Sequence, residues 1–112
     1  MVEHLAPVLR VADAEASVRW YERLGFVKQW EHRFAPHLPR YVGIARADMH
    51  LHLSEHAGDA RPGTLVYLYV SDVDAMAAAC GVTEIADMDW GRDFMVMDPD
   101  GNRLRIGTPK DS

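Results

Sequence analysis

The segment VADAEASVRWYERLGF, residues 11–26, decides how the first half of the chain is organised. Asp13 stands where a helix N-cap is needed, because its carboxylate can accept hydrogen bonds from the first free backbone N–H groups. Apolar side chains then recur at helical spacing until Gly25, a residue type that commonly ends a helix. Branched residues alternate with others in LAPVLRVA (5–12), which is typical of a strand. The segment therefore predicts a strand followed by a helix over residues 14–24.

Three more strands are expected after this helix. They are FVKQWEHRF (26–34) and a hairpin of YVGIARA (41–47) and MHLHLS (49–54). The stretch EHAGDARPG (55–63) is polar and contains Gly and Pro, so it is predicted to be a linker.

The same order of elements repeats after the linker. The predicted elements are a strand TLVYLYV (64–70), a helix SDVDAMAAAC (71–80), and strands within VTEIADM (82–88), DFMVM (93–97) and RLRIG (103–107). Between the last two strands, Pro99 favours a type I turn and Gly101 supplies a left-handed residue. Each half thus reads βαβββ. We expect one α+β domain over residues 1–112, with a first module at about 5–54 and a second at about 64–108.

Composition limits the possible partners and compartment. A chain of 112 residues fits one domain, and its net charge of −5 argues against nucleic acid or an anionic membrane as partner. No apolar run is long enough to span a membrane, and MVEHLAPVL lacks the pattern of a secretory signal. The single cysteine, Cys80, ends an alanine-rich helix, where a small buried hydrophobe is expected rather than a reactive thiol, and one cysteine fits a reducing compartment. A cytoplasmic protein is expected.

Several sequence segments within the doubled βαβββ order resemble those of a known superfamily. VADAEASVRWYERLGF and FMVMDPDGNRLRI are similar to segments of the vicinal oxygen chelate superfamily, which includes glyoxalase I, extradiol dioxygenases and bleomycin resistance proteins. The resemblance covers about residues 5–108, and APVLRV, TLVYLYVSDVD and DWGRDF are most similar to the bleomycin resistance proteins. It implies two βαβββ modules with concave mixed sheets and helices on the outer face.

The resemblance also implies where metal-dependent members would carry their ligands. Those positions fall on Ala6, on Thr64 or Leu65, on Arg105 and on His52, and only the histidine is a useful ligand. A catalytic divalent site needs about three His, Cys or carboxylate ligands, and a guanidinium has no lone pair to donate. We therefore expect no metal and no other cofactor.

His50 and His52 share one face of a predicted strand, since residues two apart point the same way. They are interpreted as half-solvated residues that line a cavity. A displaced metal site formed with His4 stays open, and with it the alternative of a lyase or dioxygenase. No arrangement of nucleophile and base emerges from the serines or elsewhere, so a binding protein is expected rather than an enzyme.

Aromatic residues mark the expected cavity. In the strand 64–70, Tyr67 and Tyr69 take the face opposite the aliphatic residues, and Trp30 is predicted to share a face with Phe26, His32 and Phe34. Trp90 lies in a loop with Asp87, Asp89 and Asp93 close in sequence. Flat rings offer stacking surfaces, and carboxylates at the rim would favour a cationic ligand. The predicted ligand-binding residues are Trp30, Phe34, His50, His52, Tyr67, Tyr69, Asp89, Trp90 and Arg105.

The resemblance implies a ligand and an assembly as well. Bleomycin resistance proteins hold the planar, cationic glycopeptide in a cleft at a dimer interface and act by sequestration. They also exchange their N-terminal strands, and Pro7 matches the proline at which the exchanged arm leaves the subunit. Proline stiffens the chain there and removes one ladder donor. A homodimer that sequesters a bleomycin-like antibiotic is therefore expected.

Overall fold

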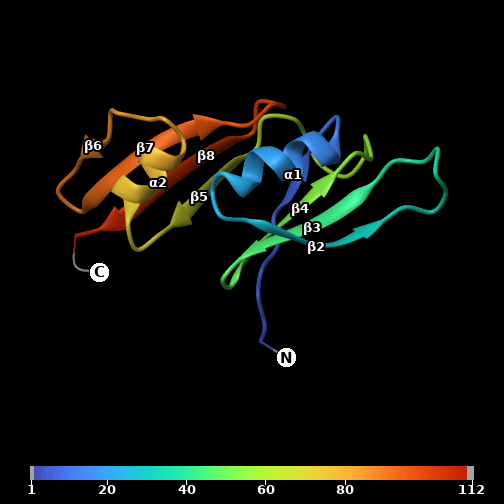
Figure 1. Ribbon diagram of the computed structural model, residues 1–112, viewed down its shortest axis with the longest axis horizontal. Helices are drawn as coiled ribbons and strands as arrows, with labels where there is room; N and C mark the ends of the chain where they lie inside the picture. Colours follow the sequence, from blue (N-terminus) through green and yellow to red (C-terminus); the bar gives the residue numbers. More distant parts are fainter. Residues whose placement is uncertain (1, 111–112) are drawn as a thin grey trace.

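The computed structural model describes residues 2–110, which form two four-stranded sheets, each covered by one helix (Figure 1). The first module contains β1 (Val8–Arg10), α1 (Ala14–Glu22), β2 (Val27–His32), β3 (Tyr41–Arg46) and β4 (Met49–Ser54). The second contains β5 (Leu65–Tyr69), α2 (Val73–Ala79), β6 (Ala86–Asp87), β7 (Gly91–Met97) and β8 (Arg103–Pro109). The predicted α+β class and the doubled βαβββ order are confirmed.

The two sheets have the same topology. Their strand orders are β1-β4-β3-β2 and β5-β8-β7-β6. In each, the first strand pairs parallel with the last, and the other pairs are antiparallel. Each sheet is therefore mixed, as expected. None of the described helices is long and apolar enough to cross a membrane.

Local sequence signals explain both helices. The Asp13 carboxylate accepts hydrogen bonds from the N–H groups of Glu15 and Ala16 at 3.0 and 3.2 Å, and Gly25 has a φ of 83° just beyond α1. Asp72 caps α2 in the same way, through Ala75 N–H at 3.1 Å. These caps satisfy N–H groups that have no partner inside the helix.

Two predicted strands are shorter in the structure. The expected strand over 5–12 is reduced to Val8–Arg10, because the ladder with β4 ends where His52 N–H bonds to the carbonyl of Pro7. The strand expected within 82–88 is only Ala86–Asp87, since Val82 N–H instead closes the end of α2 on the carbonyl of Ala77.

Trp30 shares a sheet face with only some of the residues that were predicted to lie beside it. The register of β2 against β3 shifts between Lys28 and Trp30, which is the mark of a β-bulge. Because a bulge adds one residue, it reverses the alternation of side chains beyond it. Phe26 is consequently buried beside Tyr21 on the helix side, whereas Trp30 and His32 face away from the helix. The expectation that Phe26 shares a face with Trp30 is wrong.

One apolar core runs under both helices and joins the modules. It includes Leu9, Tyr21 and Leu53 from the first module and Phe94 and Ile106 from the second, each at most 5% exposed. On the opposite sheet faces, several large side chains stay open to solvent, among them Trp30, Tyr69 and Met95. The helices therefore fix the outer surface and leave the concave faces without cover.

The DPDG turn is part of the joint between the modules. Tyr21 on α1 donates its hydroxyl proton to Asp98 Oδ2 at 2.8 Å, and Asn102 bridges from Asp98 to the carbonyl of Arg10. Gly101 has a φ of 83°, as predicted for this turn. The turn is thus structural, and its buried carboxylate holds α1 and β1 against the second module.

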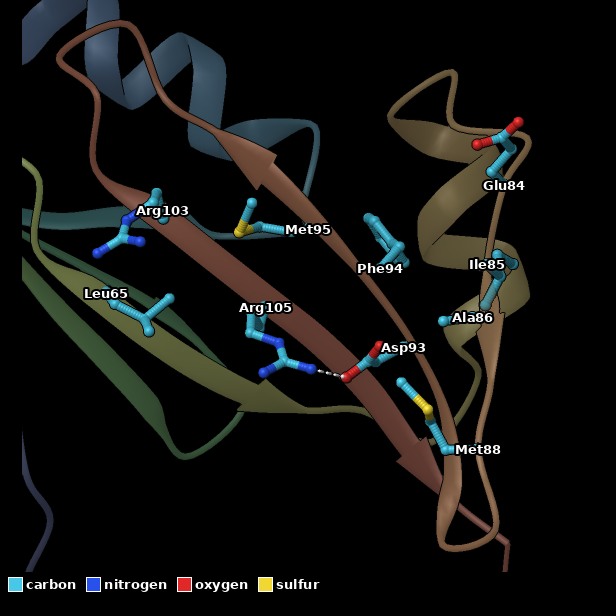
Figure 2. Close-up of a pocket in the computed structure, with 10 residues that line it drawn as sticks. All are labelled: Leu65, Glu84, Ile85, Ala86, Met88, Asp93, Phe94, Met95, Arg103 and Arg105. Atoms are coloured by element: carbon cyan, nitrogen blue, oxygen red, sulfur yellow. Dashed lines mark hydrogen bonds and ion pairs between the residues drawn. The ribbon is translucent and has the colours of Figure 1, made fainter.

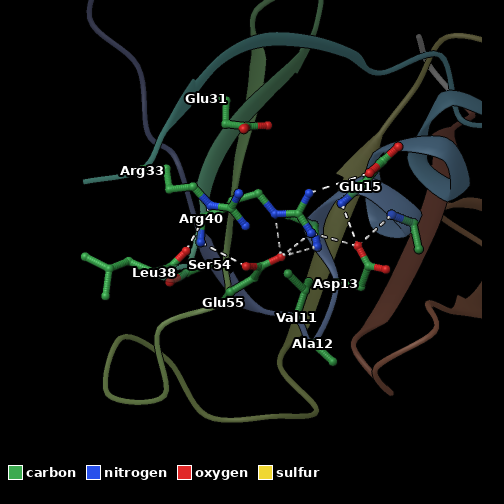
Figure 3. A network of polar contacts seen from close by, with 12 residues as sticks. Val11, Ala12, Asp13, Glu15, Glu31, Arg33, Leu38, Arg40, Ser54 and Glu55 are labelled. Carbon is green, nitrogen blue, oxygen red and sulfur yellow. Dashed lines mark hydrogen bonds and ion pairs between the residues drawn. The ribbon is translucent and has the colours of Figure 1, made fainter. Parts of the chain in front are cut away.

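A second polar network fixes the start of α1 (Figure 3). Arg40, just before β3, contacts Glu55 at 2.8 Å and Asp13 at 3.0 Å. Glu55 also accepts the N–H of Ala14 at 2.8 Å. The two side chains of the Arg40–Glu55 pair are only 18% and 12% exposed, so this network stabilises the helix start.

Candidate ligand-binding site

The concave face of the first sheet carries a cluster of three rings in contact, here called the sheet-one cluster: Trp30, Tyr41 and His52. The indole of Trp30 lies parallel to Tyr41, with ring centroids 5.8 Å apart and an angle of 6°. His52 meets both rings edge-on, and its Nδ1 lies 2.8 Å from the Tyr41 hydroxyl. Trp30 is 44% exposed, so one face of this cluster is available for stacking.

A glycine makes the position of Trp30 possible. Gly43 on β3 is the strand partner of Trp30, and a Cβ at Gly43 would overlap the indole, with Nε1 only 2.7 Å away. Glycine within a strand often marks such a close approach. The indole can therefore lie flat over the strand instead of standing away from it.

His50 lies beside this cluster but has a different partner. Its ring stacks on that of His4 from the N-terminal arm (residues 2–7), with centroids 3.8 Å apart and an angle of 19°. The arm runs away from the body of the molecule (Figure 1). With residues of β4 and β5 it lines a groove of about 550 Å³.

The concave face of the second sheet carries the sheet-two cluster: Tyr67, Tyr69, Trp90, Asp93 and Arg105. Arg105 Nη2 lies 2.6 Å from Asp93 Oδ2, and Tyr67 donates its hydroxyl proton to the same oxygen at 3.2 Å. The guanidinium also lies over the Tyr67 ring, 5.5 Å from its centroid. Asp93 is only 4% exposed, and a buried carboxylate needs partners that offset the loss of its hydration. Arg105 and Tyr67 of the same chain supply them.

A glycine again makes room for the aromatic side chain. Gly107 lies between Tyr69 and Asp93 in the strand register, and a Cβ there would collide with the Tyr67 hydroxyl. Tyr67 can reach Asp93 only because β8 has no side chain at this position. Gly43 and Gly107 thus play the same role in the two modules.

The pKa shifts of Tyr41, His52 and Tyr67 favour the uncharged form of each ring at neutral pH. Burial, followed by the neighbouring Asp93, raises the pKa of Tyr67, so the hydroxyl stays a donor at neutral pH. Burial is also the largest cause that raises the pKa of Tyr41 and lowers that of His52; nearby His50 and His4 lower the latter further. The arrangement can stack on a flat ligand and hydrogen-bond to it.

A groove of about 710 Å³ follows the concave face of the second sheet (Figure 2). Its walls combine apolar side chains, including Met88 and Met95, with the charged residues Glu84, Asp93, Arg103 and Arg105. Methionine adapts its shape to irregular partners. The sheet-two groove therefore presents an open surface of mixed apolar and charged character along the sheet.

The structure gathers most of the predicted site residues, in two groups. Trp30 and His52 join the sheet-one cluster, and Tyr67, Tyr69, Trp90 and Arg105 join the sheet-two cluster, where Trp90 lies 6.0 Å from Tyr67. Among residues 2–110, no aromatic contact links the two groups. The two clusters are therefore separate aromatic surfaces, although the groove beside the arm has both His50 and Tyr67 in its lining.

Three predicted residues lie apart from these groups. His50 stacks on His4 of the N-terminal arm. Phe34 follows the end of β2, is 77% exposed and contacts the edge of His32. Asp89 is exposed in the bend before β7 and does not line the sheet-two groove. The neighbouring acidic residues are already paired: Asp87 with Lys110 at 3.6 Å, and Asp93 with Arg105.

Comparison with protein families identifies the fold family of the chain. A family model described as a glyoxalase superfamily protein matches residues 1–112. The chain belongs to the glyoxalase superfamily. The resemblance to the vicinal oxygen chelate proteins is thereby confirmed. A search of curated proteins found no match.

Solved structures of the same superfamily fold resemble the chain over nearly its whole length. TnmS3, an antibiotic binding protein from Streptomyces sp. CB03234, has a TM-score of 0.78 and 28% identity, with 98% of each chain covered. A bleomycin-binding protein complexed with bleomycin has a TM-score of 0.75 and 20% identity, covering 97% of this chain and 100% of the other. The oxidase ChaP-H2 has a TM-score of 0.68 and 21% identity, covering 96% and 93%. At these lower identities, the last two show the fold alone.

The residues at the superfamily's metal positions do not fit a metal. Arg105 cannot donate a lone pair and is engaged with Asp93. His4 and His50 stack face to face, so their ring nitrogens do not converge, and His52 faces Tyr41. Within residues 2–110, no group of three or more His, Cys, Asp or Glu side chains is placed to hold a metal ion.

Sequence reasoning missed Tyr41, Gly43 and Gly107. Tyr41 follows a loop with two prolines, and the sequence indicates only that a strand begins there. The two glycines carried a usable signal, since an isolated glycine inside a strand pattern suggests close approach of another group. Which side chain approaches depends on the strand register, which the sequence did not reveal.

Proposed function

We propose that this chain is a binding protein that sequesters an aromatic antibiotic of the bleomycin class without changing it chemically, and so gives drug resistance. One observation carries the proposal: large rings are held half-exposed on both concave faces, and a glycine makes room for Trp30 on one face and for Tyr67 on the other. Trp30, Tyr69 and Trp90 are 44%, 63% and 43% exposed, although aromatic rings usually bury most of their surface. Contiguous apolar surface of this kind marks a binding site.

The comparisons support the class of ligand. TnmS3, with 28% identity over 98% of both chains, is an antibiotic binding protein, and the bleomycin-binding protein shares the fold. Arg105 at the position of a superfamily metal ligand supports binding without metal chemistry. The proposed site consists of both clusters together with His50.

The acidic residues near the sheet-two groove indicate where a positive group of the ligand would bind. Asp87 and Asp93 are paired with cations of the chain itself, so they contribute little attraction to a cationic drug. Asp89 and Glu84 are exposed, and Glu84 lines the sheet-two groove. We assign the positive tail of the drug to this acidic end.

We further propose that the binding unit is a homodimer with exchanged N-terminal arms. Val2 and Leu5 of the arm are 73% and 88% exposed in the single chain, so a partner subunit that covered them would bury apolar surface. A subunit interface would also remove the exposed rings of both concave faces from water, and two-fold pairing would cover both faces at once. The sheet-one cluster of one chain would then face the sheet-two cluster of the other.

Calorimetric titration with bleomycin tests the binding function, followed by mass spectrometry of the recovered drug. We expect binding at micromolar protein, one drug per cleft, and an unaltered drug mass. Sedimentation should show a species of twice the 12.6 kDa chain mass, and deletion of residues 1–8 should abolish both dimer and binding. Absence of heat with bleomycin would exclude this drug, and a monomer that still binds would exclude the exchanged dimer.

The alternative is a lyase or dioxygenase of the same superfamily. The fold similarity to the oxidase ChaP-H2 favours it, together with the three histidines His4, His50 and His52 near the arm. Elemental analysis of the purified protein separates the two functions. Stoichiometric zinc, nickel, iron or manganese would favour the enzyme.

A further inference from the structure

The sheet-two groove contains two arginines in different electrostatic situations. Arg103 and Arg105 are two residues apart on β8 and point to the same face. Arg105 is paired with the buried Asp93 carboxylate, as the dashed line in Figure 2 shows. Among residues 2–110, no ion pair involves Arg103. Its charge is therefore the one that the groove offers to a ligand.

The surroundings of Arg103 are apolar. In the strand register it lies between Leu65 and Met97, which are 49% and 59% exposed. A flat ligand that covered these side chains would also remove water from the guanidinium. A charge-assisted hydrogen bond is stronger when water is excluded, and the planar guanidinium fork matches an acid group with two oxygens.

The other end of the groove has the opposite charge. Glu84 follows α2 and lies across the groove from Arg103 in Figure 2. With Asp93 and Arg105 neutralising each other, the remaining charges of the lining are one cation and one anion at separate ends. The groove is thus polarised along its length.

We infer that the Arg103 end of the sheet-two groove binds an anionic group, a carboxylate or sulfonate, carried by a flat aromatic ring system of the ligand. The inference rests on the proposed binding function and adds to it the chemistry of one end of the ligand. A basic group at the Glu84 end remains compatible with it. Arg103 is then a specificity-determining residue, whereas Arg105 is held by Asp93 and positions Tyr67.

Two fluorescent probes test this inference, because they share a skeleton and differ in charge. Anilinonaphthalene sulfonate carries a sulfonate, and N-phenylnaphthylamine is uncharged. We expect the wild-type protein to bind the sulfonate roughly tenfold more tightly, the ratio that corresponds to one hydrogen bond with a charged group. R103Q should remove this preference and leave the affinity for the uncharged probe unchanged.

Two further variants serve as controls. E84Q removes a charge from the opposite end of the groove and should bind the sulfonate at least as tightly as the wild type. K28Q removes a cation from β2, outside the groove, and should behave as the wild type. Equal affinity of the wild type for both probes, or a sulfonate affinity unaffected by R103Q, would overturn the inference alone. Failure of both probes to bind would overturn the inference as well, whereas the proposed binding function fails only if bleomycin also gives no heat.

Discussion

The Trp30 indole lies over the backbone of Gly43, and the space that it fills is the space a side chain at Gly43 would need. This relationship places an exposed ring flat on the concave face and parallel to Tyr41. Gly43→Ala should therefore push the indole out of its stack. We expect the affinity for the antibiotic to fall by about 1–3 kcal/mol, the range for losing an aromatic anchor.

Tryptophan emission and calorimetry check this prediction. The emission of the free G43A protein should shift, because the environment of Trp30 changes. Gly58→Ala is a matched control, since a Cβ at Gly58 has no neighbour within 4 Å. Unchanged affinity in G43A would remove Trp30 from the binding site.

Trp90 provides a test of the sheet-two cluster. It is 43% exposed and lies 6.0 Å from Tyr67, so its removal should cost little folding stability. Trp90→Ala should weaken antibiotic binding by about 1–3 kcal/mol and leave the Tm nearly unchanged. A large fall in Tm with unchanged affinity would instead identify Trp90 as a structural residue.

The pair of Arg105 and Asp93 should contribute measurably to stability. Asp93 is buried, whereas the Arg105 side chain is 41% exposed, so solvent screens part of the interaction. A double-mutant cycle of Asp93→Asn and Arg105→Met should give a coupling of about 1–2 kcal/mol in denaturant unfolding. The exposed pair of Lys28 and Glu31, cycled in the same way, should give less than about 0.5 kcal/mol. Equal coupling in both cycles would contradict this account.

The hydrogen bond from Tyr21 to Asp98 joins the two modules. Tyr21→Phe leaves the buried Asp98 carboxylate short of one donor, and we expect a loss of about 1–3 kcal/mol in the free energy of unfolding. Tyr69→Phe removes a hydroxyl from a ring that is 63% exposed and should change it by less than about 0.5 kcal/mol. If Y21F is as stable as Y69F, the contact does not hold the modules together.

The stability of the protein should depend on pH through His52. Burial, and then the nearby His50 and His4, lower the pKa of His52 below its usual 6.5, so the folded protein resists a proton that the unfolded chain accepts. Stability is therefore complete above pH 6.5 and falls as the pH drops from there through the folded pKa. Denaturant unfolding at neutral and mildly acidic pH should show this loss, and His52→Gln should reduce it. The control variant His37→Gln replaces a histidine in the exposed turn after β2 and should leave this loss of stability unchanged.

Local signals in the sequence determined the order of elements. The Asp13 cap, the left-handed Gly25 just beyond α1 and the DPDG turn each depend on residues close together in the chain. Such interactions are present wherever the segment lies, so they could be predicted without the fold. The same holds for the faces of Tyr67, Tyr69, His50 and His52, because strand alternation is local.

Only the tertiary structure decided how the site is assembled. The bulge in β2, which separates Trp30 from Phe26, depends on the register with β3. The roles of Gly43 and Gly107 depend on which ring crosses them, and the neutralisation of Asp93 depends on Arg105 twelve residues away. Strand register and contacts between distant segments result from the packing of the whole core, and no local pattern in the sequence encodes them.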